Sequence, residues 1–115
     1  MTAAARVLLI DDESSVLLAL KLLLEAFGYQ VQDFSDPTLA IEALKASAEP
    51  LDICLCDLRM PKLTGLQVLE QAKRLAPGIK FALMSAHASD LELKRARELG
   101  VDDTLSKPFT PDDLS

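Results

Sequence analysis

The chain has 115 residues, of which half are hydrophobic, and a formal net charge of -6. This length allows one compact globular domain and makes two implausible. A sequence pI of about 4.6 excludes the basic surface that phosphate backbones require, so we expect no direct binding of nucleic acid by this segment. No apolar stretch approaches the roughly 20 residues that span a bilayer, and we expect a cytoplasmic protein without a membrane segment.

The two cysteines, Cys54 and Cys56, lie two positions apart in an apolar run. In a strand both side chains point to the same side of the sheet, and this spacing cannot close a normal disulfide. A metal site would need two further soft ligands, and the sequence has a single histidine, His87. We therefore predict buried, reduced thiols, which fit a reducing compartment.

The pattern of apolar runs predicts an α/β doubly wound sheet. Residues 7–10 are continuously apolar and β-branched at both ends, which is typical of a parallel strand covered by helices on both faces. Turn and cap signals then separate alternating helices and strands. The expected strands are 7–10, 30–34, 52–56, 79–84 and 101–105. The expected helices are one from Ser14 or Ser15 to Phe27, one from Pro37 to about Ser47, one from Thr64 to before Pro77, and one over 89–99. Thr110-Pro111 predicts the start of a fifth helix, truncated at Ser115.

The first helix has more leucines than one apolar face needs. Helical spacing places Val16, Leu20, Leu23 and Phe27 on one stripe, and Leu18 and Leu22 fall outside it. Two interpretations stay open: the buried face is wide, or these two leucines form a docking surface for a partner helix.

Polar side chains follow the apolar runs at the point where each run ends. Asp11 and Asp12 follow the first run, Asp57 the third, Ser85 the fourth and Lys107 the fifth. Open α/β sheets build their sites at the carboxyl ends of their strands. Three carboxylates gathered there would repel one another, and such a cluster makes sense around a hard divalent cation.

The acidic pair Asp11-Asp12, the segment from Asp57 to Pro61 with Gly65 after it, Ser85-Ala86 and Lys107-Pro108-Phe109 resemble the receiver domain of two-component response regulators. The resemblance covers nearly the whole chain. It implies a flavodoxin-like fold with strand order 2-1-3-4-5. It also implies that a sensor histidine kinase or phosphotransfer protein donates a phosphoryl group to Asp57, and that the domain has no independent substrate as an enzyme.

The same resemblance assigns roles to individual residues. Mg²⁺, for which Mn²⁺ can substitute, would be bound by Asp12, Asp57 and the backbone carbonyl of Arg59, with Asp11 acting largely through water. Lys107 would neutralise charge on the transferring phosphoryl group, and its bond to Pro108 is expected to be cis. The Ser85 hydroxyl would sense the added group.

The sequence departs from the family pattern at the switch. Thr104 stands where most relatives have an aromatic residue, so coupling from Ser85 is expected to pass instead through the loop Ala86-His87-Ala88. Arg59 and His87 stand two residues after Asp57 and Ser85, where they are either solvated loop side chains or tune dephosphorylation.

Three rival functions compete with the receiver interpretation. A magnesium-dependent phosphohydrolase would need a second aspartate at Arg59, and a flavin carrier would not place Asp11-Asp12-Glu13 at its phosphate loop. An adaptor that works without phosphorylation usually loses an acid or the lysine, whereas all are present here. The truncated fifth helix indicates a fragment of a longer protein. A transcription factor, an enzyme domain and a solitary receiver would all begin in this way, so a covalently linked output domain beyond Ser115 is one of the open alternatives.

Overall fold

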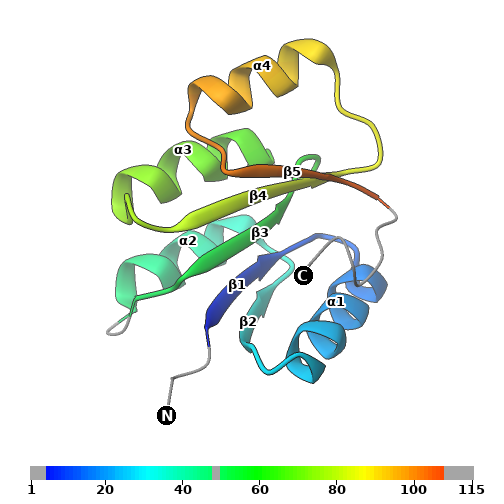
Figure 1. Ribbon diagram of the computed structural model, residues 1–115, viewed down its shortest axis with the longest axis vertical. Coiled ribbons are helices and arrows are strands. Elements are labelled where there is room, and N and C mark those ends of the chain that lie inside the picture. The colour runs from blue at the N-terminus through cyan, green and yellow to red at the C-terminus, as the bar shows by residue number, and fades with distance from the viewer. Residues whose placement is uncertain (1–4, 48–49, 108–115) are drawn as a thin grey trace.

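The computed structural model describes residues 5–47 and 50–107, and they form one parallel sheet with helices on both faces (Figure 1). The strands are β1 (Arg6–Ile10), β2 (Gln30–Phe34), β3 (Ile53–Asp57), β4 (Lys80–Ser85) and β5 (Asp103–Ser106). The helices are α1 (Ser14–Ala26), α2 (Pro37–Ala46), α3 (Gly65–Leu75) and α4 (Asp90–Glu98). The strand order β2-β1-β3-β4-β5 confirms the flavodoxin-like topology.

Alternate residues of the central strands supply two separate cores. Leu8, Ile10, Cys54 and Cys56 face α2, α3 and α4, while Leu9 and its neighbours face α1. Figure 1 shows α1 on the opposite side of the sheet from the other three helices. Both cysteines are free and fully buried on one face, as the strand period requires.

The buried face of α1 differs from the expected stripe. Leu17, Leu20 and Leu24 are the buried residues of this helix, whereas Phe27 is 54% exposed. Phe27 was assigned wrongly to the buried face: the helix ends at Ala26, and Phe27 is its C-cap with an exposed side chain. The observed stripe shares Leu20 with the predicted one, but Leu17 and Leu24 are buried in place of their neighbours Val16 and Leu23.

Local signals in the sequence fix most helix ends. Thr64 and Ser89 each form a capping box, with Gln67 and Glu92 respectively. Asp36 caps α2 by accepting a hydrogen bond from the Thr38 N–H. The start of α1 is the exception, because its N-cap is Glu13, without a side-chain hydrogen bond, rather than a serine.

The register of the sheet brings the carboxyl ends of four strands together. Ile10 pairs with Cys56, Asp57 with Met84, and Ser85 with Ser106. Asp11 follows β1 and Lys107 follows β5, while Asp57 and Ser85 are the last residues of β3 and β4. These four residues therefore lie together at the carboxyl ends of the strands. The expected fifth helix and the Lys107-Pro108 bond fall on residues 108–115, outside the described residues.

Candidate phosphoacceptor and metal site

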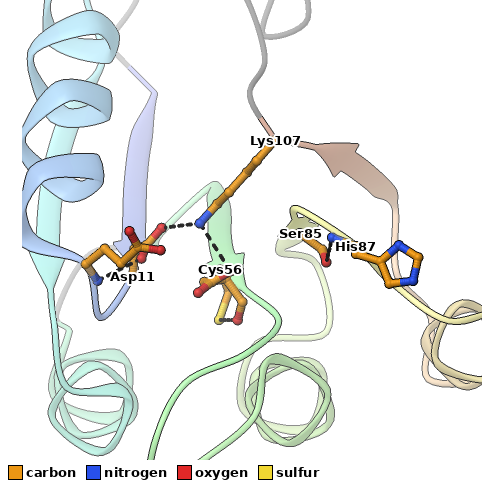
Figure 2. A network of polar contacts seen from close by, with 7 residues as sticks. Asp11, Cys56, Ser85, His87 and Lys107 are labelled. Carbon is orange, nitrogen blue, oxygen red and sulfur yellow. Dashed lines mark hydrogen bonds and ion pairs between the residues drawn. The ribbon is translucent and has the colours of Figure 1, made fainter.

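Lys107 joins the carboxylates at this edge of the sheet. Its Nζ lies 2.8 Å from Asp11 Oδ2 and 3.2 Å from Asp57 Oδ1, and Figure 2 shows the side chain reaching toward Asp11. The backbone fixes the lysine at the same time, because its N–H donates to the Ser85 carbonyl at 2.8 Å. Lys107 is 96 positions from Asp11 and 50 positions from Asp57 in the sequence, yet the three side chains form one polar cluster.

Burial makes the charges of this cluster interdependent. Asp11 is fully buried and Asp57 is 6% exposed. Burial and the neighbouring Asp11 carboxylate raise the pKa of Asp57 above its usual value, although Lys107 pulls it back down. Burial alone would lower the pKa of Lys107, but Asp11 and Asp57 raise it on balance, which keeps the amine protonated.

The three aspartates fit a small hard cation. One carboxylate oxygen from each of Asp11, Asp12 and Asp57 lies within 4.8 Å of the others, and all the donors are oxygens, as Mg²⁺ prefers. Asp12 is exposed, so solvent reaches the cluster from this side. One lysine cannot neutralise three carboxylates, and this excess negative charge is the physical argument for a divalent ion.

Gly65 lets α3 start directly against the Asp57 backbone. A Cβ atom added at this position would lie 2.5 Å from the Asp57 carbonyl oxygen and 2.8 Å from Leu58 Cα. Real Cβ atoms essentially never approach so closely, so glycine is required by the space rather than by the backbone angle. The start of α3 therefore packs directly against the end of β3.

Ser85 ends β4 beside this cluster and bonds locally. Its Oγ accepts a hydrogen bond from the His87 N–H at 3.0 Å, which leaves the hydroxyl hydrogen free to donate elsewhere. The His87 imidazole points away from the Lys107 amine (Figure 2). A cavity of about 220 Å³ is lined by Asp57, Ser85, Lys107, His87 and, among others, Arg59.

The Arg59 side chain extends from the loop after β3 to the start of α4. Its Nη2 lies 2.7 Å from Glu92 Oε1 and donates to the His87 carbonyl at 3.3 Å. The structure therefore brings Glu92, which the sequence did not single out, close to the site. The capping pattern Ser89-x-x-Glu92 indicated a helix start but gave no sign of this ion pair.

Thr104 lines a second cavity beneath the β4–α4 loop. This cavity has a volume of about 250 Å³ and is shared by Thr104, Ser85, His87 and apolar residues that include Leu83 and Leu93. The side chain of Thr104 lies on β5 and is exposed. Ser85 and Thr104, the two predicted switch residues, thus border the same space.

Leu18 and Leu22 lie apart from the carboxylate cluster, on the exposed face of α1. They are 57% and 59% exposed, so the interpretation that they merely widen the buried face is wrong.

Within the described residues, none of the helices has the length and apolar character that crossing a membrane requires.

A doubly wound sheet with an acidic cluster and a lysine at its carboxyl edge defines a class of protein that binds ligands at the ends of parallel strands. The model of the response regulator receiver domain matches residues 7–115, and the chain belongs to this family. It is the receiver domain of a two-component response regulator.

Curated relatives and a solved structure agree with this assignment. The chain is 32% identical over 110 residues to the alkaline phosphatase synthesis transcriptional regulatory protein PhoP of Bacillus subtilis, covering 96% of this chain and 45% of the relative. It is 38% identical over 109 residues to the alginate biosynthesis transcriptional regulatory protein AlgB of Pseudomonas aeruginosa, covering 95% and 24%. A CheY-like receiver domain from Methanospirillum hungatei superposes with a TM-score of 0.91 at 29% identity, covering 96% of this chain and 87% of that one. The chain thus spans less than half the length of these two curated relatives.

Proposed function

We propose that this domain is a switch controlled by phosphorylation of Asp57. An Asp57 carboxylate oxygen attacks phosphorus, a new O–P bond forms, and the P–N bond of a phosphohistidine breaks with its electron pair going to the imidazole. The observation that carries this proposal is the buried Asp57 carboxylate 3.2 Å from the Lys107 ammonium, beside two further aspartates.

The neighbouring residues have distinct parts in this reaction. Lys107 stabilises negative charge on the phosphoryl oxygens, and the Ser85 hydroxyl donates to one of them once the group is attached. We propose Asp12, Asp57 and the Arg59 carbonyl as direct ligands of Mg²⁺ or Mn²⁺, and Asp11 as a ligand through water. When bound, the ion supplies further neutralisation of the transferring charge.

Intact mass after incubation with acetyl phosphate and Mg²⁺ tests the proposal. A gain of one phosphoryl group that is absent in Asp57→Asn supports phosphorylation at this residue. An unmodified wild type would instead favour an adaptor that binds partners without phosphorylation. Asp52→Asn, an exposed carboxylate near the opposite edge of the sheet, is the matched control and should still be modified.

We propose the exposed leucines of α1 as the contact with a kinase or phosphotransfer protein. Leu18→Lys should slow phosphotransfer from a histidine kinase and leave phosphorylation by acetyl phosphate unchanged. Leu39→Lys is a close control, because Leu39 is also 57% exposed but lies on α2. Equal transfer rates for the two variants would refute this assignment.

We propose that the phosphorylated state is transmitted through the β4–α4 loop. The cavity shared by Ser85 and Thr104 gives this loop space to move inward without displacing a ring. Structures with and without beryllofluoride, a phosphoryl mimic, should differ at Ala86, His87 and Ala88. An unmoved loop would count against this route.

Arg59 and His87 are proposed to tune the lifetime of the phosphorylated state, since both line the cavity that contains Asp57. Replacing both with alanine should change the rate at which the phosphoryl group is lost, and an unchanged lifetime would refute the tuning role.

We further propose a cytoplasmic receiver that controls a covalently linked output domain. The buried reduced thiols and the partial coverage of the relatives support this context. Sequencing the protein beyond Ser115 and locating it by cell fractionation test the two statements.

A further inference from the structure

We propose that Glu92 is a positioning residue that holds the Arg59 guanidinium away from Asp57 and thereby slows phosphorylation in the resting state. This inference rests on the proposed function. It begins from the mouth of the site, where the cavity of about 220 Å³ has Asp57 and Arg59 in one lining. Glu92 does not line this cavity; it reaches Arg59 from α4.

The charges at this mouth oppose an anionic phosphoryl donor. Asp57 is surrounded by Asp11 and Asp12, and Glu13 also lines the cavity. Two side chains in the described lining are cationic at neutral pH, Lys107 and Arg59. Each already has acidic partners, because Lys107 contacts Asp11 and Asp57 while Arg59 contacts Glu92 at 2.7 Å.

The Arg59–Glu92 pair is suited to partner exchange. The Arg59 side chain is 61% exposed, so its pairing with one carboxylate is weak and screened by solvent. A phosphoryl group carries more charge than a carboxylate and offers three acceptor oxygens. Arginine binds such groups through several N–H donors at once. An arriving donor therefore competes with Glu92 for the same guanidinium.

Glu92 connects this competition to the loop that senses it. Its Oε1 atom also accepts the Ser89 N–H at 3.0 Å, and the Arg59 guanidinium reaches the His87 carbonyl. In the resting state the arginine consequently ties the loop after β3 to both the β4–α4 loop and the first turn of α4. Departure of Arg59 toward the phosphoryl group releases this tie.

Glu92→Gln is the sharpest test, because glutamine preserves the capping box and removes only the charge. We expect acetyl phosphate to phosphorylate this variant about two- to fivefold faster than wild type, matching the strength of one exposed ion pair. In this reaction the Asp57 oxygen forms its bond to phosphorus while the P–O bond breaks and acetate leaves. The melting temperature should fall by no more than about 4 °C, as expected for the loss of one exposed ion pair. A purely structural role would slow phosphorylation instead of accelerating it.

Two further variants decide the mechanism. Glu98→Gln removes a carboxylate from the same helix, where Glu98 pairs with Arg95 at 4.0 Å, and should leave the rate unchanged. In an Arg59→Gln background, Glu92→Gln should have no further effect. Acceleration that persists in this background, or that Glu98→Gln reproduces, would overturn the proposal in favour of a general charge effect.

The outcomes also separate this inference from the proposed function. If the wild type and all variants fail to gain a phosphoryl group, phosphorylation at Asp57 itself is refuted. If all are phosphorylated at the same rate, the switch stands and the role of Glu92 is refuted. Raising the salt concentration should narrow the difference in phosphorylation rate between wild type and Glu92→Gln, because salt weakens the exposed Arg59–Glu92 ion pair.

Discussion

Gly65→Ala should destabilise the domain and disturb Asp57 in one step. The added Cβ would lie 2.5 Å from the Asp57 carbonyl oxygen, 2.7 Å from Leu83 Cδ2 and 2.8 Å from Leu58 Cα. Two of these three atoms belong to the backbone and cannot rotate away. Overpacking of this kind costs about 1–3 kcal/mol, and backbone contacts place the cost at about 2–3 kcal/mol.

The helical preference of alanine opposes this cost. Alanine is favoured over glycine by at most about 1 kcal/mol within a helix, so the net loss is about 1–2 kcal/mol. A chain of 115 residues has an unfolding entropy of about 240 cal/mol/K, which converts this loss into a melting temperature lower by about 4–8 °C. Differential scanning calorimetry measures the shift.

Gly78→Ala provides the control, because a Cβ at Gly78 meets nothing within 4 Å. Its stability should stay within about 1 kcal/mol of wild type. Phosphorylation by acetyl phosphate should slow in Gly65→Ala, as the end of β3 shifts, and stay unchanged in Gly78→Ala. Equal melting temperatures for the two variants would refute the close approach of α3 to Asp57.

Three further predictions follow from buried or paired ionisable groups. Burial raises the pKa of Asp57, so ionisation of this carboxyl destabilises the folded state as the pH rises above 3.8. Asp57→Asn should therefore have a higher melting temperature than wild type at pH 7 in EDTA. This difference in melting temperature should disappear below pH 3.8. Lys62 and Thr38 hold the pKa of Asp36 at about 2, so its stabilisation is present above 3.8 and lost as pH falls toward 2; Asp36→Asn should show a shallower loss over that interval in urea unfolding. Burial raises the pKa of the Cys54 and Cys56 thiols, so a thiol reagent should label both slowly in the native protein and rapidly in urea.

The sheet could be predicted because its strands carry strong local patterns. The run of residues 7–10 is apolar at every position, as a strand covered on both faces must be, and it is fully buried in β1. Helix starts were equally legible where a side chain caps the backbone, as at Thr64 and Ser89. Strand ends moved by one or two residues, so that Asp57 closes β3 instead of following it.

The face of α1 could not be predicted, because leucines occupy almost every turn of this helix on several sides. With Leu17, Leu18 and Leu20 so close together, periodicity alone supports more than one stripe. The choice is made by packing against β1 and β3, which buries Leu17 and leaves Leu18 exposed. Information about this choice lies in the tertiary contacts.

The ion pairs near the site that sequence analysis did not predict are made by long charged side chains. Arg59 pairs with Glu92 across 33 positions, and Lys62 pairs with Asp36 across 26. No local periodicity specifies such pairs, since flexible side chains choose partners only after the loops have been placed. The clustering of Asp11, Asp12, Asp57 and Lys107 was easier to predict, because each of these residues stands at the end of an apolar run.

The stability of the fold and its proposed reactivity make opposite demands on Asp57. Burial and Asp11 raise the pKa of this carboxyl, so the folded chain favours its neutral form more than the unfolded chain does, yet only the ionised carboxylate is a nucleophile. Lys107 meets part of this demand by contacting Asp11 and Asp57 together. Any divalent cation that binds the three aspartates favours ionisation further and is linked to folding through the same charges. Readiness for phosphorylation and resistance to unfolding should therefore increase together as the cation concentration rises.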